Sequence, residues 1–280
     1  MGIETIPVDR LERLTPVAHH VAELVNLTLN PQAPYVGTSA FAHKAGLHVS
    51  AIAKRPDAYE HVPPDSVGNG TRFVVSELAG KSTLTLKAKE LGISLDGPQL
   101  NDLIDTLKRM EHDGYHFEVA DASLELLMRR ATGWEQRWFE VESFRVITDD
   151  DDPFAAPTVA RGVTTEATIK VHVDGERVIA TAEGNGPVNA LDTALRKALG
   201  DRYPALGPVH LTDYKVRVLD TAKGTGAVTR VLVDSTNGDR SWTTIGVSEN
   251  IIEASWQALY DSLVYGLLLG HGLPDDTEGQ

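Results

Sequence analysis

His43, His48, Tyr59 and His61 lie in one segment whose neighbouring side chains are mostly small or apolar. A histidine exchanges protons near neutral pH, so each of these rings is a candidate acid or base. The alanines and glycine around them leave room for a ligand or another chain to approach closely. The segment therefore predicts proton-transfer chemistry, although no triad, paired-carboxylate or zinc-helix motif elsewhere in the chain completes an active site.

The spacing of His43 and His48 bears on whether they share a ligand. The sequence predicts a short alanine-rich helix over residues 39–54, stopped by Pro56. On a helix, five residues turn the chain by about 140°, so the two rings would point to different faces. A zinc helix instead carries its histidines at i and i+4. We therefore expect no metal site here, with one ring in a cleft and the other satisfied elsewhere.

Two glycine-containing segments have the composition of anion-binding loops. Gly80–Ser82 resembles the end of a phosphate loop, but Val75 stands where that loop needs glycine, which excludes a nucleoside-triphosphate site. Gly184–Pro187 lacks the third glycine of a dinucleotide motif. It predicts a tight strand-to-helix turn. The amides of that turn either hold a carboxylate, such as that of an amino-acid effector, or form a plain turn.

Composition excludes several classes of protein. The net charge of −14 argues against nucleic-acid binding, because a phosphate backbone needs a basic surface. The chain has no cysteine, which fits a reducing cytoplasm and excludes disulfides and thiolate metal sites. No apolar run approaches a membrane span, and Met1–Thr5 does not resemble a secretion signal. The run Asp149–Asp152 predicts a solvated turn rather than a calcium loop, whose alternate spacing it lacks.

The elements that position these segments change in type near Trp134. Before it, apolar residues recur at helical spacing, and Pro98 stands where a helix begins. The predicted helices of this part are residues 9–26, 80–91, 98–112 and 118–131, in addition to 39–54. A helical region is therefore followed by a region of mostly strands.

The second region contains an internal repeat of three strands and a helix. The predicted strands are residues 138–146, 165–173 and 177–183, then 213–219, 227–234 and 241–247, with helices over 187–199 and 249–269. Asp174-Gly175 and Asn237-Gly238 predict hairpin turns. Each helix begins shortly after a strand that ends in glycine, Gly184 or Gly246. Two such βββα units bury their remaining apolar faces on each other or on a second chain.

Five segments together resemble the C-terminal part of the citramalate synthase and 2-isopropylmalate synthase family. They are Ser39–Ala51 (SAFAHKAGLHVSA), Tyr59–Asn69 (YEHVPPDSVGN), Val75–Ser82 (VSELAGKS), Gly184–Ala190 (GNGPVNA) and Val247–Ser255 (VSENIIEAS). The lysine of HKAG and the segment HVSA resemble the citramalate branch more closely. The resemblance covers nearly the whole chain.

The resemblance implies an α+β fold: a mostly helical accessory region, then a regulatory domain of two βββα units, without the family's catalytic (β/α)8 barrel. The implied boundaries are a linker helix over 1–30, a helical accessory subdomain over 31–132, a regulatory dimerisation domain over 133–270 and a tail over 271–280. In the family the barrel carries the divalent metal, the oxo-acid site and most acetyl-CoA contacts. We therefore expect no cofactor to be bound by this chain itself.

The resemblance also implies roles for particular residues. His48 and Tyr59 match the histidine and tyrosine that enter a partner's barrel, where they would assist the condensation of acetyl-CoA with pyruvate to citramalate. The double repeat implies a homodimer that senses an amino acid, isoleucine or alternatively leucine. The residues expected near that effector are Gly184, Asn185, Gly186, Pro187, Ser248 and Asn250.

Alternatives to the citramalate synthase interpretation remain open on the sequence. One is the regulatory portion of a 2-isopropylmalate or homocitrate synthase, since acceptor choice is made largely by the barrel. Another is a stand-alone dimeric module that binds a branched-chain amino acid and acts on a barrel in trans. A structural oligomer without a ligand is the third. In each case we expect no condensing activity from this chain without a barrel.

Overall fold

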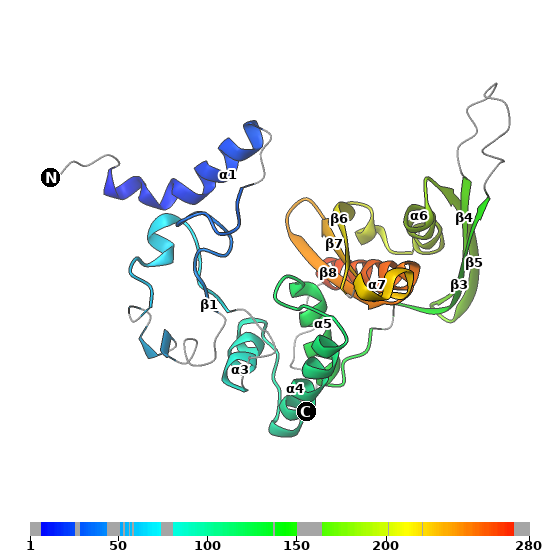
Figure 1. The fold of residues 1–280 in the computed structure, drawn as a ribbon, viewed down its shortest axis with the longest axis horizontal. Helices are drawn as coiled ribbons and strands as arrows, with labels where there is room; N and C mark the ends of the chain where they lie inside the picture. Colours follow the sequence, from blue (N-terminus) through cyan, green and yellow to red (C-terminus); the bar gives the residue numbers. More distant parts are fainter. Residues whose placement is uncertain are drawn as a thin grey trace. The chain divides into compact units, whose positions relative to one another are not determined.

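The structure, a computed structural model, divides the chain into two compact units, residues 1–105 and 106–280 (Figure 1). The residues it describes are 7–25, 29–43, 51–52, 54–55, 57, 59–73, 81–136, 138–149, 164–200, 202–219 and 221–271. Within these ranges, no helix is long and apolar enough to cross a membrane.

The first unit consists of short elements joined by turns. A 3-10 helix, η1 (Val8–Arg13), leads into α1 (Leu14–Leu24), so the helix predicted over 9–26 is an α-helix only from Leu14 to Leu24. The later elements are β1 (Ala42–His43), the 3-10 helix η3 (Pro64–Val67), β2 (Arg72–Phe73) and α3 (Lys81–Glu90). The Thr15 hydroxyl donates to the Val67 carbonyl at 2.7 Å, which fastens α1 to η3.

Strand β1 shows that the helix predicted over residues 39–54 is wrong at Ala42 and His43. These two residues pair in parallel with β2, and the Arg72 N–H donates to the Phe41 carbonyl at 3.0 Å. The pairing joins residues about thirty positions apart, and such tertiary contacts override the helix propensity of alanine. Residues 44–50 lie outside the described part of the chain.

Two further helices lie close to the positions that the spacing of the apolar residues predicted. Helix α4 (Gly97–His112) begins with a reciprocal cap, in which the Gln99 N–H donates to Asp96 Oδ1 at 2.8 Å and the Asp96 N–H to Gln99 Oε1 at 2.9 Å. Helix α5 (Asp121–Ala131) begins three residues after its predicted start. It is buried on several sides, including the charged Glu125 and Arg129.

The second unit contains the predicted repeat, which confirms the α+β fold. The first βββα unit is β3 (Phe139–Asp149), β4 (Thr164–Val173), β5 (Glu176–Gly184) and α6 (Pro187–Leu199). The second is β6 (His210–Val218), β7 (Thr229–Thr236), β8 (Ser241–Ser248) and α7 (Ile251–Gly270). Both sheets are antiparallel, in the orders β3-β4-β5 and β6-β7-β8. The 3-10 helices η4 (Pro204–Leu206) and η5 (Thr221–Gly226) complete the unit, and the described residues contain no (β/α)8 barrel.

The two βββα units bury their apolar faces on each other. Along β4, Ala167, Ile169 and Val171 are fully buried while the residues between them are more exposed, as expected for a strand with one covered face. Helix α6 covers this sheet and α7 covers β7 and β8 (Figure 1). Trp256 of α7 also packs on Phe144 of β3, with ring centroids 4.9 Å apart. One apolar core therefore joins both repeats.

A glycine at or near the end of each unit's third strand permits a close approach of strand to helix. A Cβ at Gly246 would lie 1.9 Å from the Ala254 carbonyl oxygen, and a Cβ at Gly184 would lie 2.5 Å from the Ala190 nitrogen. Both contacts are closer than any real Cβ makes. Packing between the third strand and the helix therefore requires a glycine in both units.

The outer edge of β8 is closed by side chains rather than by another strand. Three backbone N–H groups donate to side-chain oxygens, each at 3.1 Å: Thr243 to Asp121, Ile245 to Ser123 and Val247 to Gln257. Asp121 and Ser123 belong to α5, so this helix is fastened along the edge of the second sheet. Three N–H groups that an edge strand would otherwise leave unpaired therefore have acceptors.

Candidate functional site

The segment predicted to be catalytic lies in the first unit, and the structure describes part of it. His48 lies outside the described residues. The Tyr59 side chain is described and is 46% exposed. The interpretation of His43 and His48 as two residues of one helix is wrong, because His43 lies in β1.

His43 takes part in a small buried cluster. Its Nε2 lies 3.1 Å from Glu60 Oε1, and the Thr71 hydroxyl donates to the same oxygen at 2.7 Å. The Glu60 carboxylate is almost fully buried, so these two bonds are its compensation for lost hydration. The cluster therefore joins Glu60, the residue after Tyr59, to His43 of β1 and to Thr71 directly before β2. His43 therefore has a hydrogen-bond partner within its own unit, as we expected for one of the pair His43 and His48.

The rest of the YEHVPPDSVGN segment is held by turn chemistry. Gly68 has φ 69°, and a Cβ there would lie 2.0 Å from the Glu12 carbonyl oxygen. The Asn69 amide donates to the carbonyls of Tyr35 at 2.7 Å and Gly37 at 3.0 Å. Gly68 and Asn69, the last two residues of the segment, thus have structural roles in this turn.

The turn from β5 to α6 contains four of the residues expected near an effector. Gly184 packs against α6, and the Asn185 N–H donates to Asn189 Oδ1 at 3.1 Å. Gly186 is the N-cap of α6, with Pro187 in the first turn and no side chain accepting from the helix amides. The first amides of α6 are therefore left to solvent or a ligand.

The turn from β8 to α7 differs from its counterpart. The Asn250 N–H donates to Ser248 Oγ at 3.1 Å, and Asn250 Oδ1 accepts from the Ile252 N–H at 2.9 Å and the Glu253 N–H at 3.4 Å. The start of α7 is thus capped by its own side chain. Ser248 and Asn250 have structural roles in this turn, whereas the start of α6 leaves amides free to bind a carboxylate.

A large hollow lies entirely within the second unit and was not predicted. It has a volume of about 1010 Å³ and is bordered by the segments before and after α5, the start of β3, the β4–β5 turn and the first half of α7. Its apolar wall includes five aromatic rings: Tyr115, Phe117, Phe139, Trp256 and Tyr260. A cavity of this size is large enough for a small-molecule ligand.

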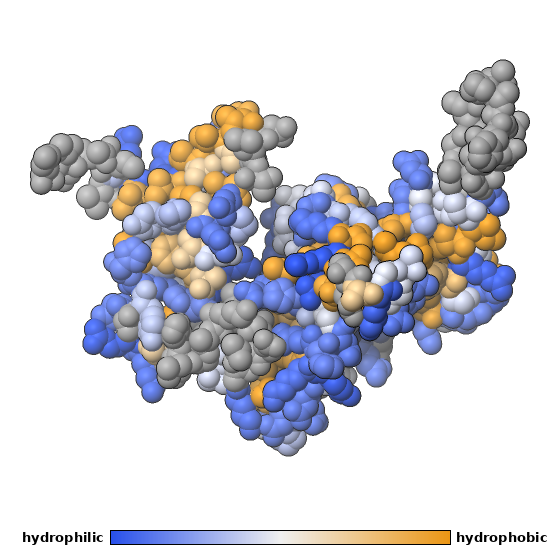
Figure 2. Space-filling view, viewed as in Figure 1, coloured by the Kyte–Doolittle hydropathy of each residue, from blue (hydrophilic) through white to orange (hydrophobic). Residues whose placement is uncertain are grey.

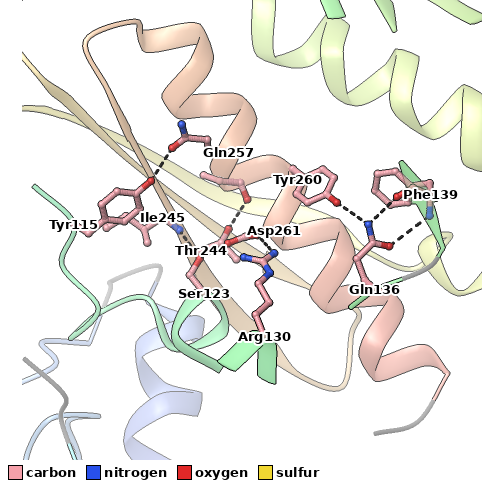
Figure 3. Close-up of polar contacts among 11 residues, drawn as sticks. Tyr115, Ser123, Arg130, Gln136, Phe139, Thr244, Ile245, Gln257, Tyr260 and Asp261 are labelled. Atoms are coloured by element: carbon pink, nitrogen blue, oxygen red, sulfur yellow. Dashed lines mark hydrogen bonds and ion pairs between the residues drawn. The ribbon is translucent and has the colours of Figure 1, made fainter. Parts of the chain in front are cut away.

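A polar network between α5 and α7 forms one side of this cavity (Figure 3). Arg130 Nη2 donates to Asp261 Oδ1 at 2.9 Å, and the Ser123 hydroxyl donates to Asp261 Oδ2 at 3.0 Å. Burial raises the pKa of Asp261, and the Arg130 guanidinium opposes that rise. Since Ser123 also accepts from the Ile245 N–H, the network links α5, β8 and α7.

Two tyrosines extend the network along α7 (Figure 3). The Tyr115 hydroxyl donates to Gln257 Oε1 at 2.9 Å, and Gln136 Nε2 donates to the Tyr260 hydroxyl at 2.6 Å. Burial is the main cause that raises the pKa of each phenol, and the Asp261 carboxylate adds to it in both cases. The sequence held no signal for these contacts, because the partners are more than a hundred residues apart.

Comparison with known proteins relates both parts of the chain to one group of enzymes. Residues 118–267 match the family "LeuA allosteric (dimerisation) domain", and residues 35–114 match "Homocitrate synthase post-HMGL domain-like". The chain is 50% identical over 270 residues to an (R)-citramalate synthase of Streptomyces coelicolor, covering 95% of this chain and 49% of that protein.

Two other relatives show the same relationship. The (R)-citramalate synthase of Aquifex aeolicus is 47% identical over 281 residues, covering 100% of this chain and 51% of the relative. That of Synechocystis is 51% identical over 271 residues, covering 96% and 49%. The chain thus spans about half the length of these curated relatives.

Proposed function

Because the chain belongs to the family of the LeuA allosteric (dimerisation) domain, we propose that it is the accessory and regulatory portion of a citramalate synthase. The observation that carries the proposal is near 50% identity to (R)-citramalate synthases over almost the whole chain. The complete enzyme would condense acetyl-CoA with pyruvate and water to citramalate and CoA. Its place would be the cytoplasm, in isoleucine biosynthesis.

In this proposal the condensation takes place on a barrel, in cis or in trans, and the first unit completes that site. Tyr59 supports the proposal because its ring is half exposed while the adjacent Glu60 is anchored to His43 and Thr71. A phenol held in this way would position substrate or relay a proton, and His48 would help to deprotonate acetyl-CoA. In this proposal the divalent metal of the family would be held by the barrel; among the described residues, no group of three or more His, Cys, Asp or Glu side chains is placed to hold a metal ion.

The apolar surface of α1 supports contact with a barrel. Val17, Val21 and Leu24 lie on one helical stripe and are 49–72% exposed, and the neighbouring Val25 is 56% exposed. Figure 2 shows this helix as an apolar patch on the first unit. A contiguous apolar patch of this kind marks an interaction surface.

The second unit would form the regulatory homodimer. Leu211, Val216 and Val218 lie on edge strand β6 and are 40–45% exposed. Val216 is directly opposite the buried Val231 of β7, so it belongs to the face that elsewhere packs on α7. A second chain covering this face would complete the sheet's apolar layer.

The effector would bind at the start of α6 and reduce activity by feedback inhibition. The open amides beyond Gly186 suit the carboxylate of an amino acid, isoleucine first and leucine as the alternative. Gly184, Asn185 and Pro187 shape this turn, and Ser248 and Asn250 would approach from the start of α7, from this chain or its partner. The contacts of α7 with α5 would carry the signal out of the regulatory domain.

A condensation assay tests the division of labour. The purified chain is mixed with acetyl-CoA and pyruvate, and release of free thiol is followed. We expect no turnover above background, because the oxo-acid site and metal ligands would lie on the barrel. Robust turnover by the chain alone would overturn the proposal.

A substitution at Asn185 tests the effector residues separately. Asn185→Ala retains the backbone N–H that bonds to Asn189, so the turn is expected to fold normally. Isoleucine affinity by calorimetry should fall, whereas the matched Asn101→Ala variant, at an exposed position on α4, should bind as the parent does. Equal affinities in all three proteins would place the effector elsewhere.

A further inference from the structure

The cavity of the second unit has a composition that the proposed function does not use. The Tyr260 ring lies beside those of Phe139 and Trp256 along its wall, with ring centroids 5.4 Å and 6.2 Å away. Tyr115 stacks on Phe117 at 5.7 Å along another wall. Two aromatic walls therefore face one hollow of about 1010 Å³.

The charges around these walls are mostly negative. Glu135, Glu140 and Glu253 line the cavity, and none of them has a cationic partner among the described residues. Among the described residues that line the cavity, Arg130 is the one lysine or arginine, and its guanidinium is paired with Asp261. The hollow therefore contains uncompensated negative charge beside aromatic faces.

The raised pKa values of two tyrosines agree with this negative character. The pKa of Tyr115 is raised by burial, then by Asp261, with Glu253 adding to the rise. The pKa of Tyr260 is raised by burial, with contributions from Asp261 and Glu140 that the Arg130 charge only partly opposes. Groups on both walls thus retain their protons more strongly than in water, because the cavity disfavours negative charge.

We propose that this cavity binds a small organic cation, an amine or ammonium with an apolar body. The ammonium would lie among Glu140, Glu253 and the aromatic faces, which attract cations through their quadrupoles. The apolar body would replace water against Trp256 and Tyr260.

A carboxylate ligand is disfavoured at this place. Arg130 is already paired with Asp261, and a further anion would meet glutamates that have no cationic partner among the described residues. The start of α6 has the opposite character, with open amides that favour an anion. The cavity is thus a second site, independent of the proposed effector site in both position and ligand charge.

Three ligands of matched size test the inference: n-butylamine, n-butanol and butanoate. Each is titrated into the folded chain at pH 7 while the indole N–H signals of the tryptophans are followed by NMR. We expect saturable shifts of the Trp256 signal, assigned with Trp256→Phe, for the amine. We expect affinities for the alcohol and the carboxylate at least about tenfold weaker, from the loss of attraction between unit charges.

The double variant Glu140→Gln/Glu253→Gln should lower the amine's affinity about tenfold. Its control is Glu166→Gln/Glu183→Gln, which changes the net charge equally at exposed positions of β4 and β5 outside the cavity. The control should bind the amine as the parent does. The inference is overturned if the amine leaves Trp256 unshifted, if butanoate binds as tightly, or if the two double variants behave alike. None of these outcomes bears on isoleucine binding.

Discussion

Substituting Gly246 by alanine tests the close approach of β8 to α7. The added methyl carbon would lie 1.9 Å from the Ala254 carbonyl oxygen, 2.9 Å from its carbonyl carbon and 2.9 Å from Gln257 Cβ. Two of these atoms belong to the α7 backbone, which cannot rotate away as the end of a flexible side chain would. Strand and helix must therefore move apart, in the part of the core where α7 packs on β7 and β8.

The expected cost follows from the kind of overlap. Overpacking a well-packed core costs about 1–3 kcal/mol, and backbone obstruction places this substitution near about 3 kcal/mol. For a unit of 150–250 residues, 1 kcal/mol corresponds to about 2–4 °C in the melting temperature. Gly246→Ala should therefore lower Tm by about 6–12 °C. This loss is partly offset because alanine restricts the unfolded chain more than glycine does, which returns up to about 1 kcal/mol to the free energy of unfolding.

Gly226→Ala is the matched control for Gly246→Ala. Its Cβ would have no heavy atom within 4 Å, so only the unfolded-state effect remains and Tm should stay constant or rise slightly. Both variants and the parent are compared by differential scanning calorimetry. If Gly246→Ala melts within about 2 °C of the parent, the reasoning from close approach is refuted.

Three further substitutions test the helix contacts and the cap. Tyr265→Phe removes the hydroxyl that donates to buried Glu125 Oε2 at 2.8 Å and should lower the free energy of unfolding in urea by about 1–3 kcal/mol; an unchanged midpoint would contradict this. The raised pKa of Asp261 means that its contribution to stability is full below the unfolded pKa of about 3.9 and is lost as pH rises through the folded pKa. The stability of the parent relative to Asp261→Asn should therefore fall between pH 4 and pH 7 in urea titrations, and a constant difference would argue against the shift. Asn250→Ala removes the acceptor for the Ile252 N–H and should cost about 1 kcal/mol by thermal unfolding; an unchanged free energy of unfolding would contradict a stabilising role for this cap.

The repeat was predictable because it depends on local patterns. Alternating strands, the turn at Asp174-Gly175 and the helices after Gly184 and Gly246 are all short-range signals, and the structure confirms them. Asp174 and Gly175 both have positive φ, as such a hairpin turn requires. The fold of the regulatory region could therefore be predicted almost element by element.

The first unit and the cavity were harder to predict, because distant residues determine them. Ala42 and His43 belong to an alanine-rich stretch that favours a helix locally, but pairing with β2 makes them a strand. Ser123 and Asp261 are 138 positions apart, and nothing in their spacing indicates that they meet. His48 lies outside the described residues, so its role stays a prediction, as do the roles of Tyr59 and the effector turn.

The most direct test of the regulatory proposal is an isothermal titration of the chain with isoleucine, leucine and valine. Light scattering and circular dichroism first establish that the sample is folded and dimeric. The account predicts saturable heat for isoleucine with one molecule bound per chain, and weaker binding of valine. No heat with any of the three amino acids would contradict the claim that this chain senses an amino-acid effector.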